Sequence, residues 1–140
     1  MKILLPVDGS EHTKRMLAYV AAHDELLGQQ HEYTVLTVAA PLPSHASRFI
    51  DRGTLDDYYD EQAEHVLKPV RAFVEQRQWR VRLVHLCGHA AETIAAFAAS
   101  EKTGLIVMGS HGHTSLGNVL LGSVAAGVLA RSRVPVLLIR

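Results

Sequence analysis

Two kinds of apolar pattern alternate along the whole chain. One kind is a short run, rich in β-branched and aliphatic residues and apolar on both alternating faces, which is typical of strands covered on both sides of a sheet. The predicted strands span Lys2–Val7, Tyr33–Val38, Val81–Cys87, Leu105–Met108 and Val134–Ile139. The other kind repeats its apolar positions with the period of a helix. The predicted helices span Glu11–Leu27, Leu55–Arg77, Ala90–Ser100 and Ser123–Ala130.

The ends of these helices carry local signals. Ser10 is the predicted N-cap of the first helix, and Gly28 is its predicted stop. The pair Thr54 and Asp57 reads as a capping box that opens the second helix. Pro69 lacks the N–H that continues a helix, so it predicts a kink or two shorter helices. Gly104 is the predicted end of the third helix.

Strands that alternate with helices across residues 1–140 predict a single α/β domain with a parallel sheet and helices on both faces. If the first and fourth strands are neighbours and the chain winds outward on both sides, the order of the five strands is 3-2-1-4-5. The loops after those two strands then border one crevice. Pro6 would lie in a central strand, which is tolerated where the strand pair splays apart at its C-terminal end.

Composition narrows the possible partners. The chain has 14 Lys and Arg against 14 Asp and Glu, so no broad basic field exists to hold nucleic acid or an anionic membrane. Its single cysteine, Cys87, excludes an internal disulfide and fits a reducing compartment. No apolar run approaches the length of a membrane span. The expectation is a soluble, cytoplasmic protein.

The richest chemical signal is the segment Gly109–Ser123, which follows the fourth predicted strand and leads into the last predicted helix. Glycines let backbone N–H groups approach an anion, and the first turn of a helix offers unpaired N–H donors. The segment contains several of the glycines of the chain: Gly109, Gly112, Gly117 and Gly122. The pattern predicts a phosphate cradle.

These residues resemble the universal stress protein family, in its ATP-binding branch. The branch signature is Gly, two residues, Gly, nine residues, Gly, then Ser or Thr, and Gly109, Gly112, Gly122 and Ser123 match it at full spacing. Other segments resemble the family in the family order: Pro6–Ser10, Gly88–Glu92, Val107–Gly112, Leu121–Val124 and Val134–Ile139.

The resemblance implies an ATP site. Asp8 would lie near the ribose and adenine, and Val38 would meet the adenine through its backbone. Gly109 and Gly112 would line the ribose and α-phosphate, and the outer phosphates would sit on residues 122–124, with Mg²⁺ held mainly by the phosphates. No metal ligand is predicted among the protein side chains. The predicted nucleotide-binding residues are Pro6, Asp8, Val38, Met108, Gly109, Gly112, His113, Gly122, Ser123 and Val124.

Three functions remain open at this point. The first is a regulatory module of the stress response that holds ATP with slow or no hydrolysis. The second is a weak ATP hydrolase, although Gly117–Ser123 resembles a Walker loop with serine in place of its lysine, and no catalytic residue is predicted. The third is a nucleotide-free dimeric stress or interaction protein, favoured by His113 and Asn118, which replace the basic residues usual in the branch.

Two further features bear on partners. His85, Cys87 and His89 alternate along the third strand and its exit, which fits either a metal site or a buried cysteine near the end of an outer strand. His111 and His113 fit either a metal or a polar lining for phosphates.

The last strand, Val134–Ile139, carries no charge. Such an apolar edge predicts a homodimer that pairs this strand with its copy, as the resemblance also implies.

Overall fold

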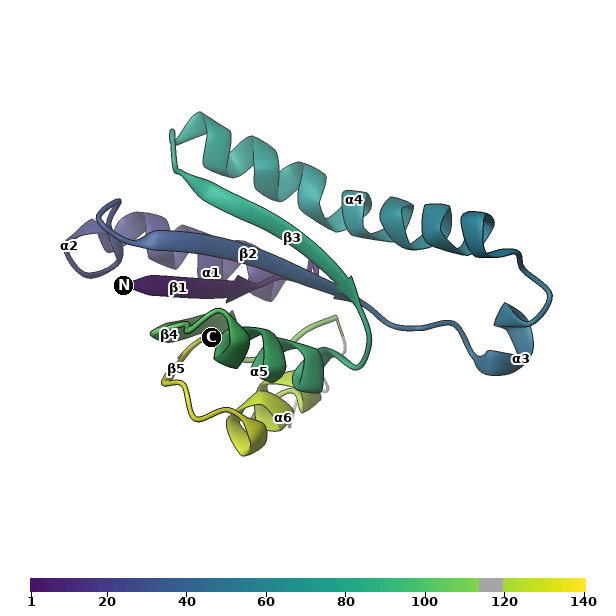
Figure 1. Ribbon diagram of the computed structural model, residues 1–140. Coiled ribbons are helices and arrows are strands. Elements are labelled where there is room, and N and C mark those ends of the chain that lie inside the picture. Colours follow the sequence, from purple (N-terminus) through teal and green to yellow (C-terminus); the bar gives the residue numbers. More distant parts are fainter. Residues whose placement is uncertain (114–119) are drawn as a thin grey trace.

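The computed structural model describes residues 1–113 and 120–140 as a five-stranded parallel sheet with the order β3-β2-β1-β4-β5 (Figure 1). The strands are β1 (Lys2–Pro6), β2 (Glu32–Ala39), β3 (Val81–Cys87), β4 (Leu105–Gly109) and β5 (Val136–Ile139). The predicted α/β class and strand order are confirmed. The last strand begins at Val136 rather than Val134, because Pro135 has no N–H for the ladder and only its carbonyl accepts, from the Ile106 N–H at 2.9 Å.

The helices are α1 (Glu11–Ala22), α2 (Asp24–Leu27), α3 (Ser44–Ser47), α4 (Arg52–Gln76), α5 (Ala90–Ser100) and α6 (Ser123–Arg131). The predicted first helix is broken at His23, whose backbone leaves the helical region. Its ring nitrogen Nδ1 lies 2.8 Å from the carbonyl of Tyr19, an acceptor near the end of α1. One helix was therefore predicted where two short ones form.

The signal predicted to begin one helix and the residue predicted to end another were wrong, although the predicted range Ala90–Ser100 is confirmed. The N-cap of α4 is Asp51, whose Oδ1 accepts from the Thr54 N–H at 3.0 Å, so the helix begins before the predicted capping box. The helix also continues through Pro69 without dividing. The end of α5 is made at Lys102, which has a φ of 56°, rather than at Gly104, whose N–H donates to the carbonyl of Lys2 on β1 at 2.8 Å.

Alternating side chains of the strands build one hydrophobic core on each face of the sheet. Leu5, Val35 and Val107 point to the face covered by α1 and α4. Leu4, Leu36 and Ile106 point to the opposite face, covered by α5 and α6 (Figure 1). Because both faces are covered, the central strands are apolar at nearly every position.

The sheet opens at the carboxyl end of β1. Register pairs β1 with β2 as far as Pro6 and Leu36, but with β4 only as far as Leu4 and Ile106. Pro6 is therefore tolerated in a central strand because β1 and β4 have already separated there, as predicted. The separation leaves the loops after β1 and β4 facing each other across a gap in the ladder.

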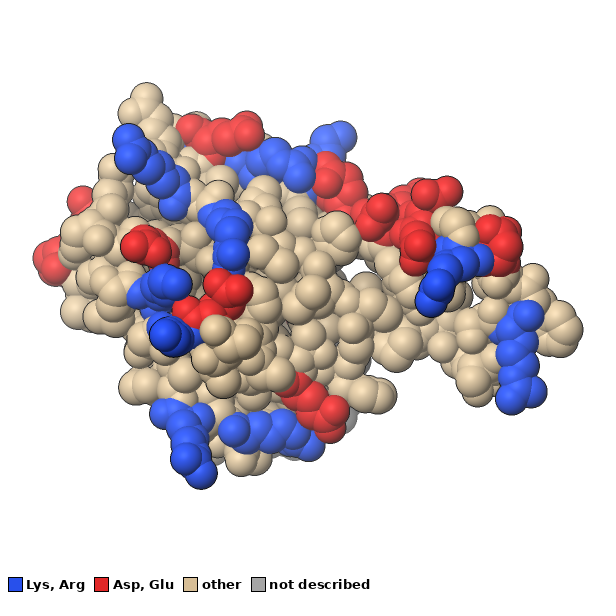
Figure 2. Space-filling view, viewed as in Figure 1, with Lys and Arg blue, Asp and Glu red and all other residues tan. Residues whose placement is uncertain are grey.

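The surface carries both signs of charge. Figure 2 shows Lys and Arg side chains interspersed with Asp and Glu over the visible face, with acidic side chains gathered along the first half of α4. No positive field covers that face, in agreement with equal numbers of basic and acidic residues. Within residues 1–113 and 120–140, none of the helices has the length and apolar character needed to cross a membrane.

Candidate functional site

One cavity lies where β1 and β4 separate, at the carboxyl edge of the sheet. The cavity has a volume of about 170 Å³. Every residue of the predicted nucleotide site lines it. The described lining is Pro6, Val7, Asp8, Thr13, Leu36, Val38, Ala90, Ile94, Met108, Gly109, His111, Gly112, His113, Gly122, Ser123, Val124 and Ala125.

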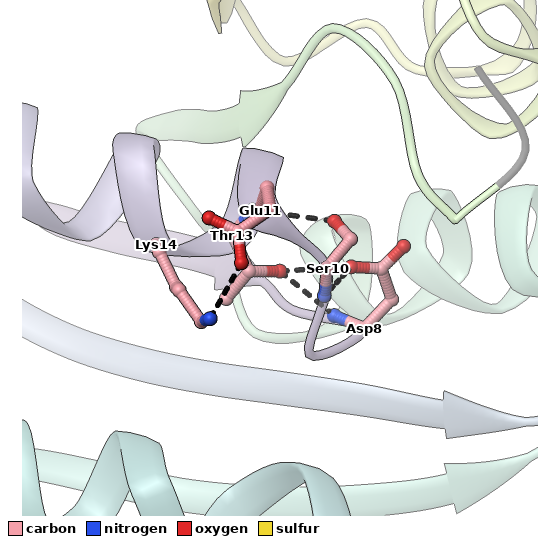
Figure 3. Close-up of polar contacts among 5 residues, drawn as sticks. All are labelled: Asp8, Ser10, Glu11, Thr13 and Lys14. Carbon is pink, nitrogen blue, oxygen red and sulfur yellow. Dashed lines mark hydrogen bonds and ion pairs between the residues drawn. The ribbon is translucent and has the colours of Figure 1, made fainter.

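The wall after β1 is held together by the carboxylate of Asp8 (Figure 3). Its Oδ1 accepts from the Ser10 N–H and from the Thr13 hydroxyl, each at 2.9 Å. The Thr13 oxygen in turn accepts from the backbone N–H of Asp8 at 3.1 Å. Gly9 makes the turn between these residues possible with a φ of +79°, which side chains rarely adopt. The loop is therefore a closed network that fixes the Asp8 carboxylate at the cavity.

The environment of Asp8 favours its charged form. Burial of the half-buried carboxyl is the largest single influence and opposes ionisation, but the hydrogen bonds from Ser10 and Thr13 outweigh it. The charge of His113 acts in the same direction as the hydrogen bonds. The pKa of the Asp8 carboxyl therefore lies below its ordinary value of 3.8, and the cavity carries a fixed negative charge at neutral pH.

The wall after β4 depends on glycines that leave no room for a side chain. A Cβ at Gly109 would lie 2.8 Å from the Cβ of His12, and one at Gly122 would lie 3.0 Å from the Cα of His111. A Cβ at Gly112 would lie 2.5 Å from Oδ2 of Asp8. The signature glycines thus bring the loop after β4 against the loop after β1 and against the start of α6, with backbone facing the cavity.

The N-terminus of α6 opens into the cavity. Its N-cap is Gly122, which provides no side chain to bond the first N–H groups of the helix, so Ser123 is not the cap that one interpretation of the sequence allowed. The N–H of Gly122 donates to the carbonyl of Ser110 at 2.8 Å, which ties the helix start to the loop after β4. The first N–H groups of a helix have no acceptor within it and carry a partial positive charge. Ser123 and Val124 therefore present donors to an anion.

Histidines occupy the junction of the two loops. Nε2 of His113 lies 2.6 Å from the backbone carbonyl of Asp8, and the two residues are 105 positions apart in the chain. The ring of His111 packs against that of His12 on α1, with centroids 5.2 Å apart. Nδ1 of His111 lies 3.0 Å from the hydroxyl of Ser110. His111 and His113 both line the cavity. Gly117, which begins the segment resembling a Walker loop, and Asn118 lie outside the described residues.

Several lining residues were missed by sequence reasoning. Thr13 follows Ser10 by three residues, so a network with both was detectable from the first turn of α1. Ala90 and Ile94 are four residues apart on α5 and share the helix face that closes the apolar side of the cavity. That face could be assigned from periodicity, but its approach to β2 and β4 depends on tertiary packing.

The third strand holds no metal cluster in the part of the chain that is described. His85 pairs with Asp60 of α4 at 3.0 Å, and His89 is the N-cap of α5. Cys87 is exposed, so the buried cysteine predicted from its place on an outer strand was wrong. No group of three or more His, Cys, Asp or Glu residues in positions 1–113 and 120–140 could hold a metal ion. His85 and Leu86, which precede Cys87 on β3, are exposed as well.

Comparisons with known proteins give one family. A universal stress protein of Thermus aquaticus is 35% identical, covering 99% of this chain and 97% of the relative. The universal stress protein MJ0577 of Methanocaldococcus jannaschii is 28% identical over 99% of this chain and 94% of its own length, and its solved structure superposes with a TM-score of 0.82.

Two more distant solved structures share the fold. One is a universal stress protein in complex with cAMP, 19% identical with a TM-score of 0.70 and covering 100% of this chain and 97% of that one. The other is a universal stress protein of Archaeoglobus fulgidus in complex with dAMP, 22% identical with a TM-score of 0.66 and covering 100% and 98%. The model of the universal stress protein family matches residues 1–140. This chain belongs to the universal stress protein family.

Proposed function

We propose that the protein is a regulatory module that binds ATP in the cavity between β1 and β4 and hydrolyses it slowly or not at all. The observation that carries the proposal is the N-terminus of α6. This helix lacks a side-chain cap, opens into the cavity and is tied by Gly122 to the loop after β4. Such a helix start stabilises a phosphate through its N–H groups and its dipole.

The rest of the lining fits the other parts of a nucleotide. Leu36, Ile94 and Met108 give an apolar wall suited to a base. The Asp8 carboxylate is an acceptor suited to ribose hydroxyls. Gly109, Gly112 and Gly122 have no side chain, so phosphates can approach their backbone closely. Mg²⁺ would be bound mainly by those phosphates. Two solved proteins of this fold are complexes with the adenine nucleotides cAMP and dAMP, which supports this class of ligand.

Slow or absent hydrolysis follows from the groups that line the cavity. The described lining contains no lysine to hold the outer phosphates during phosphoryl transfer. Its one carboxylate, Asp8, already accepts hydrogen bonds from Ser10 and Thr13 and has a lowered pKa, so it is a poor general base. A module that holds ATP and changes its partners with occupancy suits these groups better than a fast ATPase.

Calorimetry tests the proposal with ATP, ADP and AMP, each with and without Mg²⁺, on the unaltered protein and on Gly122→Val. We expect ATP binding in the micromolar range and a loss of about 100-fold or more in Gly122→Val, because the new side chain would overlap backbone atoms of the loop after β4. Gly53→Val is the matched control, since its Cβ meets only the Asp51 side chain at 3.3 Å.

The outcomes separate the three functions. No binding at millimolar ATP would favour a nucleotide-free interaction protein. Binding that survives Gly122→Val would place the nucleotide elsewhere on the molecule. Turnover of several ATP per second, measured by phosphate release, would make the protein an enzyme.

We also propose that the protein forms a homodimer through β5. In the described sheet β5 is an edge strand that pairs with β4, and Val136–Ile139 contains no charged residue. An apolar edge of this kind is protected by pairing with its own copy around a two-fold axis. Val136→Lys should lower the mass measured by light scattering toward that of a monomer, with the far-ultraviolet circular dichroism unchanged. A dimer that persists in the folded variant would contradict the pairing.

A further inference from the structure

The phosphate end of the cavity has no permanent positive side chain. Among the described lining residues there is no Lys or Arg, and residues 109–123 contain none in the sequence. The one permanent charge of the described lining is the Asp8 carboxylate, which is negative. Positive charge at this end comes only from the partial charge at the start of α6 and from imidazoles that gain a proton.

His113 is held so that it can carry such a proton. The backbone carbonyl of Asp8 can only accept, so Nε2 of His113, 2.6 Å away, is a donor. That hydrogen is present in both the neutral and the charged ring, and Nδ1 is the nitrogen that gains the second proton. The Asp8 carboxylate and His113 attract each other when the ring is charged. His113 can therefore change its charge without breaking the contact that joins the two loops.

His111 is the second histidine of the described lining whose ring becomes positive when it gains a proton. Its ring packs on His12 at 5.2 Å, and in the described structure the buried Nδ1 of His12 has no hydrogen-bond partner. A proton on that nitrogen would be a buried donor without an acceptor, and two charged rings at this distance would repel. His111, unlike His12, lines the cavity, so a charge on its ring would face the ligand. The ion pair of Glu11 and Lys14 on the same turn of α1 is exposed and balanced.

We propose that protonation of His111 and His113 determines how many phosphates the site holds. This inference rests on the proposed nucleotide site and names its regulation. With both rings neutral, the negative Asp8 and the start of α6 suit a nucleoside or a monophosphate. With the rings charged, the same cavity suits a triphosphate, because each added positive charge stabilises a ligand of higher negative charge more strongly.

The direction of the pH dependence follows from these charges. A histidine ring that gains a proton gains a positive charge, so acidification from about pH 8 to about pH 6 can only add positive charge at the phosphate end. Asp8 stays ionised over this interval because its pKa is below 3.8. The affinity for ATP should therefore rise relative to that for AMP, and the affinity for adenosine should change little.

Calorimetry without divalent metal measures the affinities for ATP, AMP and adenosine at about pH 6 and about pH 8. In the unaltered protein the ratio of ATP to AMP affinity should be about tenfold higher at the lower pH. The variant His111→Gln/His113→Gln should lose that increase. His113→Lys should hold the ratio high at both pH values, and His45→Gln, an exposed position on α3, should behave like the unaltered protein. The free phosphates titrate identically in every experiment, so the difference between the unaltered protein and each variant reports the two histidines.

A ratio that does not change with pH in the unaltered protein would overturn the inference while leaving the nucleotide site intact. An increase that persists in His111→Gln/His113→Gln would overturn it as well, since the proton would then be taken up elsewhere. Failure of all three ligands to bind at either pH would contradict the nucleotide site itself, and this inference with it. Thermal unfolding of each variant establishes that the protein tested is folded.

Discussion

The starts of α1 and α6 lie on the two walls of the same cavity and differ in how their N–H groups are used. At α1, Ser10 accepts from the Thr13 N–H at 3.4 Å and Asp8 accepts from the Ser10 N–H at 2.9 Å. At α6, the cap is a glycine without a side chain. One helix start is closed by its own side chains, and the other is left open. The comparison shows which end suits a ligand: no side chain caps the first N–H groups of α6, whereas at α1 the Thr13 N–H is already bonded to the Ser10 side chain.

The largest effect should come from filling the space where the two walls meet. A side chain at Gly109 would overlap the Cβ of His12, which the backbone of α1 holds in place. Gly109→Val should therefore lower the free energy of unfolding by roughly 1–3 kcal/mol, the usual cost of overpacking. Urea denaturation measures it, with Gly53→Val as a control expected to differ little. An unchanged midpoint in Gly109→Val would mean that the two walls are not in rigid contact.

The next largest effect should come from removing the Asp8 carboxylate, which accepts hydrogen bonds at the start of α1. Asp8→Ala leaves the Ser10 N–H and the Thr13 hydroxyl without the oxygen that both now use. Losing an acceptor for half-buried donors should lower the free energy of unfolding by roughly 1–2 kcal/mol. Asp8→Asn retains an oxygen that can accept both bonds, so urea denaturation should show a smaller loss. Equal losses in the two variants would assign the effect to charge rather than to hydrogen bonding.

Acid should remove the stability that the ionised Asp8 carboxylate gives to the start of α1. The pKa of Asp8 is lowered in the folded protein, so its ionised form adds stability above about pH 3.8, and that stability is lost as the pH falls through the lower folded value. Chemical denaturation between about pH 5 and about pH 2.5 should show a shallower loss of stability in Asp8→Asn than in the unaltered protein. Parallel curves would show that Asp8 has the same pKa in the folded and unfolded chains.

The sequence predicted the fold and the place of the cavity, but not the contacts between residues far apart in the chain. The strand order and the approach of the two loops followed from apolar strands covered on both faces and from glycines at signature spacing, and those glycines do line one cavity. The bond from His113 to the Asp8 carbonyl joins residues 105 positions apart, and no local pattern encodes such a contact. The exposure of Cys87 was also missed, because an apolar strand pattern does not tell which of its residues the helices cover.

The smallest effect is also the most direct test of the comparison, because it uses the same substitution at both helix starts. Ser10→Ala removes a cap whose bond is long, 3.4 Å, so the free energy of unfolding should fall by about 0.5 kcal/mol, the lower end for lost caps. Ser123→Ala removes a hydroxyl that caps nothing, so stability should stay unchanged. ATP affinity measured by calorimetry should show the reverse order, falling in Ser123→Ala and holding in Ser10→Ala. If both serines affected stability alike, α6 would be closed in the same way as α1, and its donors would not be available to a phosphate.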